Sequence, residues 1–243
     1  VLFSDLRGFT TLSETLQPEA LMKLLNGYFS AMTEPILKEE GTIDKFIGDA
    51  IMAFWNAPIA VTDHEAHAVR AALMMMESLD TFNKEEEVYL QMGIGIHTGE
   101  AIVGNVGGKE RVSYTALGDT VNSGSRIEGL TKKYGVDIII SEEVKSKLDE
   151  KEFKTRKLDE VVLKGRYKKT ILYEVIRDID TEKLKKEYEA AFKFYQEGDF
   201  EKAGIIFSKL AKEGDAPSKY LLERISQIKL DEDWNGVWVF HEK

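Results

Sequence analysis

Four polar residues along this sequence have the types and spacing of a site that acts on a phosphate ester. Asp5 ends a short apolar run, residues 1–3, and Asp49 lies between two runs rich in β-branched and aromatic residues. Asn122 and Arg126 are four positions apart, so they share one face if the segment is helical. Carboxylates bind Mg²⁺ and the arginine fork binds phosphoryl oxygens, so the set predicts metal-assisted phosphate chemistry.

The residues that follow Asp5 predict a second part of such a site. Leu6, Gly8, Phe9 and Thr10 lie where a turn opens into a helix, and backbone N–H groups at such a point bind phosphate. A carboxylate beside bound phosphate repels it unless a cation lies between the two. The combination therefore predicts Mg²⁺ shared by the protein and a phosphate-bearing substrate.

Each of these residues also has a simpler interpretation. Asp5 alone is typical of a helix N-cap, and Asp49 alone is typical of a turn. Asn122 and Arg126 could be a surface pair on a solvated helix, an alternative that periodicity does not reject. Lys164 lies in a basic turn that could hold a polyphosphate, although such turns are usually only solvated.

The hydrophobic pattern predicts the elements that would position these residues. Pro18 starts an amphipathic helix, residues 41–55 form a hairpin that turns at Gly48-Asp49, and Asp63 caps a second helix. Further elements are predicted at these positions: two strands within 90–107, joined at 98–100, a helix at 119–134, and strands at 136–141, 161–163 and 171–175. The fold class is α+β, a ferredoxin-like βαββαβ arrangement with extra strands.

From about residue 180 the pattern changes to helices. Residues 187–225 are helical with breaks at 198–199 and 214–215, and they resemble a tetratricopeptide-like helical hairpin. Only one such unit is visible, which favours packing against the protein's own domain over a peptide-binding array. We therefore predict a catalytic domain at 1–178 and a helical C-terminal extension at 179–243, with Trp234, Trp238 and Phe240 anchoring the end of the chain.

Composition narrows the function classes. The chain has 243 residues, 43% of them hydrophobic, which is enough for a real core. Its 33 Lys and Arg against 43 Asp and Glu give a net charge of −10, which argues against a nucleic-acid binder. There are no cysteines and no membrane-length apolar stretch, so we expect a cytoplasmic setting, with a cytoplasmic domain of a membrane-tethered protein as the alternative. Because the sequence begins within a strand, we expect a sensor or membrane region upstream.

Five segments, in this order, make the chain similar to the catalytic domains of class III nucleotidyl cyclases of the bacterial adenylyl cyclase type. They are FSDLRGFT, DKFIGDAIMAFW, GIGIHTGEAIVGNVG, YTALGDTVNSGSRIEGL and LKGR, and the resemblance covers about residues 1–176. It implies that Asp5 and Asp49 bind two Mg²⁺ ions, for which Mn²⁺ can substitute. It also implies that Asn122 orients the ribose and that Arg126 stabilises charge at the α-phosphate. Lys164 is the candidate for the triphosphate, with Arg166 a less favoured substitute.

The same resemblance makes Lys45 and Thr115 the pair that selects the purine. Lys45 can donate a hydrogen bond to adenine N1, and the Thr115 hydroxyl can accept one from the adenine amino group. Guanylyl members typically carry Glu and a small residue at these two positions. ATP is therefore favoured, converted to 3′,5′-cyclic AMP and pyrophosphate.

In this family one domain supplies the metal aspartates and its partner supplies the purine, ribose and α-phosphate residues. This chain carries both sets, so the resemblance implies a head-to-tail homodimer with two equivalent sites. Two alternatives stay open: a guanylyl cyclase, and a cyclase-like regulatory or scaffold domain that binds nucleotide without turnover. His97 is expected in the core, and His64 and His67 as ordinary helix residues.

Overall fold

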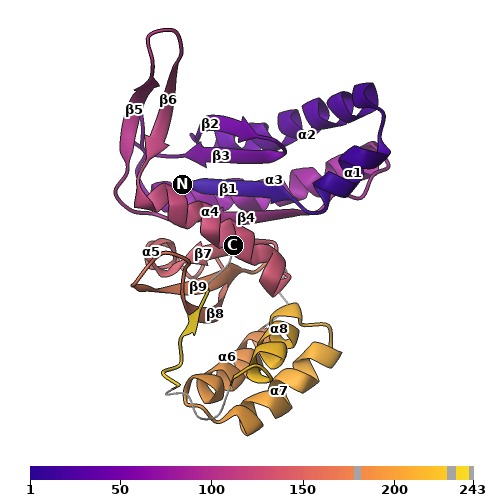
Figure 1. The fold of residues 1–243 in the computed structure, drawn as a ribbon, viewed down its shortest axis with the longest axis vertical. Helices are drawn as coiled ribbons and strands as arrows, with labels where there is room; N and C mark the ends of the chain where they lie inside the picture. The colour runs from indigo at the N-terminus through magenta and orange to yellow at the C-terminus, as the bar shows by residue number, and fades with distance from the viewer. Residues whose placement is uncertain (178–181, 229–233, 241–243) are drawn as a thin grey trace. The chain divides into compact units, whose positions relative to one another are not determined.

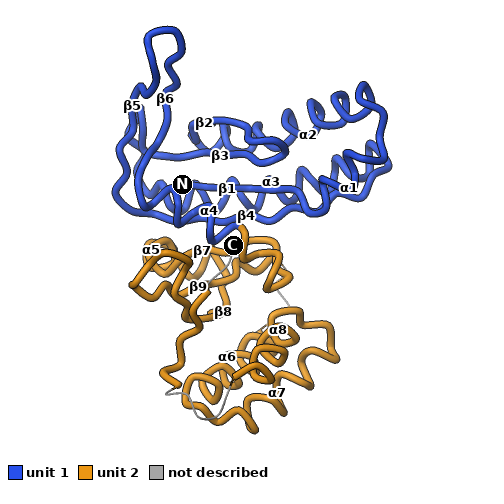
Figure 2. Tube along the Cα trace, viewed as in Figure 1, with its two compact units in different colours: residues 1–128 blue, residues 129–243 orange. Residues whose placement is uncertain are grey.

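The computed structural model describes residues 1–177, 182–228 and 234–240. The chain divides into two compact units, residues 1–128 and 129–243, which Figure 2 distinguishes by colour. This division differs from the expected functional boundary at 178/179, which stays a prediction. Each unit is described by itself.

The sheet of the first unit has the expected ferredoxin-like arrangement. Its strands are β1 (Leu2–Leu6), β2 (Thr42–Ile47), β3 (Ala50–Phe54) and β4 (Met92–Ile96), in the antiparallel order β4-β1-β3-β2. Strands β1 and β4 are almost wholly buried. The expected hairpin is confirmed, because β2 and β3 pair on either side of Gly48-Asp49, and Gly48 has the positive φ of 64° that such a turn requires.

Three helices follow the strands of this unit: α1 (Phe9–Thr15), α2 (Pro18–Lys38) and α3 (His64–Glu85). Helix α2 begins at Pro18 as predicted and packs against α3 (Figure 1). Asp63 occupies the N-cap position of α3, but its side chain makes no capping hydrogen bond and its φ is 52°. The predicted helix start is therefore confirmed and the predicted cap is wrong, because the left-handed backbone does not aim the carboxylate at the first helical N–H groups.

A two-stranded hairpin extends from this unit, formed by β5 (Ile102–Gly107) and β6 (Val112–Leu117) (Figure 1). The two strands predicted within 90–107 and joined at 98–100 are confirmed, but they do not pair with each other: β4 pairs with β1, whereas β5 pairs with β6. The sequence did contain a signal for β6, since Gly107-Gly108 is a turn dipeptide and apolar residues alternate after it. Helix α4 (Asp119–Tyr134) comes next, at the predicted position.

The second unit combines strands and helices around one core. Its strands are β7 (Ile138–Ser141), β8 (Thr155–Val162), β9 (Lys169–Val175) and β10 (Trp238–Val239), in the order β10-β8-β9-β7, with a short helix α5 (Glu142–Lys145) after β7. Its longer helices are α6 (Glu182–Gln196), α7 (Phe200–Lys212) and α8 (Ala216–Ile225). The breaks fall where predicted, and Asp199 and Asp215 cap α7 and α8 with their side chains.

A buried polar network joins the helices of the second unit to its strands. The Arg224 guanidinium pairs with the Asp159 carboxylate, which also accepts a hydrogen bond of 2.5 Å from Tyr134. Trp234 donates to the Tyr195 carbonyl at 2.9 Å, so the prediction of an anchoring role for this tryptophan is confirmed. Because a buried charge without its partner is costly, this network favours one specific packing of α8 on β8.

Candidate active site

The two candidate metal aspartates lie at neighbouring strand ends. The pairing of Ser4 with Ile51 between β1 and β3 places Asp5 and Asp49 at the same end of two adjacent strands. The Leu6 N–H donates to Asp49 Oδ2 at 3.1 Å, which ties the β2–β3 turn to the end of β1. The expectation that the hairpin lies beside the first strand is therefore confirmed.

Tyr28 of α2 lies buried behind this pair. Its hydroxyl contacts the Met92 sulfur at 3.2 Å, and burial raises its pKa, with further contributions from the negative charges of Asp49 and Asp5. One phenol thus experiences the field of both carboxylates. Two carboxylates at neighbouring strand ends suit a divalent cation.

The turn after β1 has an open surface. Gly8 is the N-cap of α1 with φ 71°, and a Cβ added there would meet nothing within 4 Å. The amides of Phe9 and Thr10 belong to the first turn of α1, where N–H groups have no partner inside the helix. The Leu6 amide already donates to Asp49, so it supports the carboxylate.

Lys45 and Thr115 are brought into direct contact. The Lys45 ammonium donates to Thr115 Oγ1 at 3.0 Å, although the two residues are 70 positions apart. Thr115 is buried on β6, whereas the Lys45 side chain is 42% exposed. A residue that sequence reasoning missed completes the group: the Thr115 hydroxyl donates to Asp44 Oδ2 at 2.6 Å.

Asn122 and Arg126 lie one turn apart on α4, as predicted. Arg126 is partly buried and makes no hydrogen bond or ion pair with any residue that the structure describes. Two glycines allow α4 to lie close to the sheet: a Cβ on Gly124 would come within 2.9 Å of Val1, and one on Gly95 within 2.2 Å of the Glu128 nitrogen. Helix α4 therefore packs closely on the sheet, and the Arg126 guanidinium is available to bind a ligand.

Comparison with known proteins decides the family. Residues 1–177 match the family described as the adenylate and guanylate cyclase catalytic domain. The chain belongs to this family. Adenylate cyclase 1 of Rhizobium meliloti is 42% identical over 179 residues, and the adenylate cyclase of Anabaena cylindrica is 41% identical over 185. Each match covers 72% of this chain but only 27% and 36% of the respective relative, so the chain spans about a third or less of their length.

Solved cyclase structures have the same mixed α+β fold. The adenylyl cyclase CyaB from P. aeruginosa superimposes with a TM-score of 0.66 at 33% identity, covering 74% of this chain and 93% of that one. The guanylyl cyclase Cya2 gives a TM-score of 0.64 at 37% identity, covering 72% and 89%. Neighbours named for both activities thus share the fold.

The donor set of this chain fits a hard divalent cation. Asp5 and Asp49 supply two carboxylates, and no group of three or more His, Cys, Asp and Glu side chains is found among the described residues. Mg²⁺ characteristically binds one or two carboxylates and completes its shell with water and substrate phosphates. Two aspartates at adjacent strand ends therefore suit Mg²⁺ and leave positions for a substrate.

The remaining candidate residues lie in several parts of the chain. Lys164 is exposed in the turn between β8 and β9 of the second unit, with Arg166 nearby, and the role of both stays a prediction. His97 is buried, as expected. His67 lies 3.0 Å from a carboxylate oxygen of Glu39.

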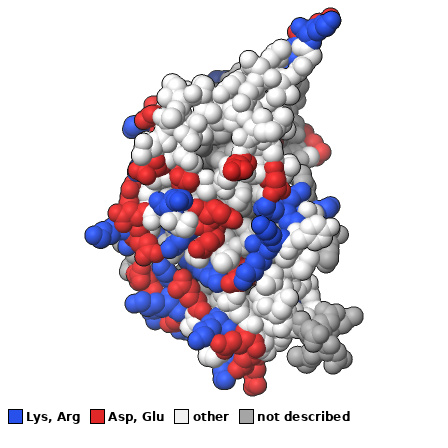
Figure 3. Space-filling view, turned by 90° about the vertical axis from the view of Figure 1, so that its left-hand side faces the viewer, with Lys and Arg blue, Asp and Glu red and all other residues white. Residues whose placement is uncertain are grey.

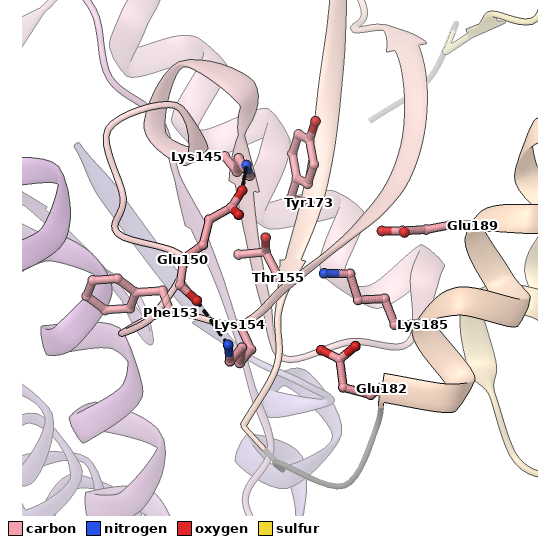
Figure 4. Close-up of a pocket in the computed structure, with 9 residues that line it drawn as sticks. All are labelled: Lys145, Glu150, Phe153, Lys154, Thr155, Tyr173, Glu182, Lys185 and Glu189. Carbon is pink, nitrogen blue, oxygen red and sulfur yellow. Dashed lines mark hydrogen bonds and ion pairs between the residues drawn. The ribbon is translucent and has the colours of Figure 1, made fainter.

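A cavity of about 350 Å³ also occurs in the second unit, near α5 and α6 (Figure 4). Lys145 donates to Glu150 Oε1 at 2.6 Å, and Lys154 donates to the Glu150 carbonyl at 3.1 Å. Lysines and glutamates line it in equal number, three of each. Such a lining offers no excess of positive charge, so the cavity does not suit a triphosphate.

No helix in the described part of the chain combines the length and the apolar character needed to cross a bilayer.

Proposed function

We propose that this chain is an adenylyl cyclase, which converts ATP to 3′,5′-cyclic AMP and pyrophosphate in signal transduction. The observation that carries the proposal is the 3.0 Å hydrogen bond between Lys45 and Thr115, which pairs a partly exposed donor with a buried hydroxyl. Such a pair matches the N1 and amino groups on the edge of adenine. The relatives named adenylate cyclase, at 41% and 42% identity, support the same activity.

In this proposal the residues act by orienting the substrate and by stabilising charge on its phosphates. Asn122 hydrogen-bonds the ribose and orients its 3′-hydroxyl toward the α-phosphorus. Arg126, one turn further along α4, stabilises the charge that develops on the α-phosphate oxygens. The amides of Gly8, Phe9 and Thr10 face the phosphates, Lys164 binds the end of the triphosphate, and no side chain acts as a nucleophile.

The family is metal-dependent, and we propose two Mg²⁺ ions per site, with Mn²⁺ as a substitute. Asp5 and Asp49 hold the metal, and the Leu6 amide keeps the Asp49 carboxylate in place. A metal held there would lower the pKa of the ribose 3′-hydroxyl and support the pyrophosphate leaving group.

We further propose that the active form is a head-to-tail homodimer. The β5–β6 hairpin exposes apolar side chains that one copy of the chain leaves uncovered, among them Ile102, which is 75% exposed, Val112 and Leu117. Figure 3 shows that the face of the first unit below the tip of the hairpin is largely free of charged side chains. Exposed apolar side chains on an uncharged face favour burial against another protein surface.

For the C-terminal helices we keep the hypothesis of a tetratricopeptide-like hairpin. Its support is that α6 packs on α7 and that Tyr195, Ala203 and Phe207 are all buried. One such unit suits packing within the second unit better than peptide binding.

A guanylyl cyclase is the second candidate, favoured by the 37% identity to the guanylyl cyclase Cya2. A domain that binds nucleotide without turnover has less support, because such a domain needs neither two metal aspartates nor an arginine at the α-phosphate. Asp5, Asp49 and Arg126 are all present.

The test is a product assay on the purified chain with ATP or GTP and with MgCl₂ or MnCl₂. Cyclic nucleotides are resolved by chromatography and mass spectrometry, and the dimer is verified by sedimentation. We expect metal-dependent cyclic AMP from ATP and little cyclic GMP from GTP. Absence of both cyclic nucleotides from a verified dimer would overturn the proposal, and cyclic GMP as the main product would establish the guanylyl alternative.

Asp49→Asn is the matched variant for this assay. Its amide oxygen can still accept from the Leu6 N–H, so the turn is retained while the charge for the metal is lost. We expect activity to fall by about 100-fold or more. The exposed Glu201→Gln on α7 removes one negative charge elsewhere and should leave activity unchanged.

A further inference from the structure

Asp44 is a buried carboxylate directly behind the proposed purine-reading pair. Its side chain is 0% exposed, and it accepts hydrogen bonds from the Thr115 hydroxyl at 2.6 Å and from the Ala116 N–H at 3.0 Å, both to Oδ2. The Lys45 ammonium lies 3.0 Å from its other oxygen. Asp44 therefore contacts both members of the pair.

An irregularity in β2 makes this arrangement possible. In a regular strand, adjacent residues point to opposite faces, so Asp44 and Lys45 would not reach one partner. Here Ile43 pairs with Ala53 and Lys45 with Met52, which leaves Asp44 as the extra residue of a β-bulge. A bulge re-aims side chains locally, and it lets both residues reach Thr115.

The hydrogen bonds give the Thr115 hydroxyl a fixed direction. An ionised carboxylate can only accept, so the single proton of the hydroxyl is donated to Asp44. The oxygen of Thr115 then has only lone pairs to offer, and Lys45 uses one of them. Toward a ligand, Thr115 is an acceptor.

This direction distinguishes the two purines. Adenine carries an amino group, a donor, at the position where guanine carries the O6 acceptor. An acceptor hydroxyl pairs with the amino group of adenine and faces guanine O6 lone pair to lone pair. Leaving a buried polar group unpaired is costly, which makes such a contact selective.

We propose that Asp44 is a positioning residue that fixes Thr115 as a hydrogen-bond acceptor and thereby selects adenine over guanine. The inference rests on the proposed cyclase function, and it adds a determinant of specificity that does not itself touch the base. The acceptor character of Thr115 comes from the residue behind it.

The test compares kcat/KM for ATP and GTP in Asp44→Asn, a variant of nearly the same shape. The amide can donate to Thr115, which frees the hydroxyl proton to meet guanine O6. We expect the ATP/GTP ratio of kcat/KM to fall by about tenfold or more. Thr115→Val removes the hydroxyl and should lower the ratio as well. In the Thr115→Val background, Asp44→Asn should change the ratio by less than about twofold, because no hydroxyl remains to be directed.

Thr115→Ser is the conservative control, since it keeps a hydroxyl that Asp44 can orient, and it should retain the preference for ATP. Thermal unfolding is recorded for every variant. If Asp44→Asn does not fold, Asp44→Ser replaces it, because the serine hydroxyl can donate as well as accept.

A purely structural role for Asp44 predicts that ATP and GTP turnover fall by the same factor, and that result overturns the inference while the cyclase function stands. If the unmodified chain makes no cyclic nucleotide from either substrate, the proposed function fails and the inference fails with it.

Discussion

Glu160 on β8 accepts hydrogen bonds from two lysine ammonium groups, Lys157 at 2.6 Å and Lys169 at 2.8 Å. Burial opposes its ionisation, but the hydrogen bonds from the two lysines outweigh that effect and lower the pKa of Glu160 to about 2. The native state therefore keeps this carboxylate charged at a pH where the unfolded chain protonates it.

The linkage between this pKa and folding gives a pH-dependent prediction. A carboxylate whose folded pKa is depressed stabilises the fold above its unfolded pKa, near 4.5, and that contribution is lost as the pH falls toward 2. Glu160→Gln should lower the free energy of unfolding by on the order of 1–2 kcal/mol at pH 7, allowing for the solvent exposure of Lys169. Urea titrations of both proteins at pH 7 and pH 3 measure the difference. A difference that stays the same or grows at pH 3 would contradict the assignment.

At the scale of single residues, residue types and spacing predicted the aspartate pair and the turn of α4 that carries Asn122 and Arg126. The partnership of Lys45 with Thr115 came from family resemblance, because nothing local joins residues 70 positions apart. Asp44 was missed for a physical reason. Strand alternation places it on the face opposite Lys45, and a bulge is a property of the pairing that one strand's sequence does not display.

Among the elements, α4 depends on a glycine in the strand beneath it. A Cβ on Gly95 of β4 would lie 2.2 Å from the backbone nitrogen of Glu128, closer than any real contact, and neither backbone can rotate away as a side chain can. This close approach determines the distance between α4 and β4, and with it the positions of Asn122 and Arg126.

Gly95→Ala should therefore displace α4. We expect a loss of about 1–3 kcal/mol in the free energy of unfolding and a fall in kcat, because the transition-state contacts of Arg126 depend on the position of the helix. Gly129→Ala, on α4 itself, is the matched control: its Cβ meets nothing within 4 Å, so it should raise the free energy of unfolding by about 0.5–1 kcal/mol. Denaturant melts and initial rates test both. Wild-type stability and activity in Gly95→Ala would show that α4 can shift freely.

The helices were predicted well because their apolar residues repeat over many turns, as in α2 and α3. Strand β5 was predicted within 90–107, but its partner β6, and so the β5–β6 hairpin, was not. Its strands expose apolar side chains such as Ile102 and Val112 on a ribbon that no sheet of its own unit covers, so the usual contrast between a buried and a solvated face is weak.

For the whole molecule, the proposed shared site makes activity a property of two chains. Asp5→Ala and Arg126→Ala chains should each be inactive as homodimers. Mixed in equal amounts, they form heterodimers in which one of the two sites has every residue, so about a quarter of wild-type activity should return. The rate of product formation during titration of one variant into the other measures this.

Dilution supplies an independent check on the same arrangement. Specific activity should fall when the protomer concentration drops below the dissociation constant of the dimer. Failure of two well-folded variants to complement, together with a specific activity that does not depend on concentration, would place the complete site within one chain.

The bulge in β2 also affects how the preference for one nucleotide can change during evolution. Because Asp44, behind the Lys45–Thr115 pair, determines whether the Thr115 hydroxyl donates or accepts a hydrogen bond toward the base, one substitution at Asp44 can alter the preferred nucleotide while Lys45 and Thr115 stay the same. Two relatives with identical base-contacting residues can then make different second messengers. Assigning a substrate to such a sequence therefore requires reading the position before the lysine as well as the lysine itself.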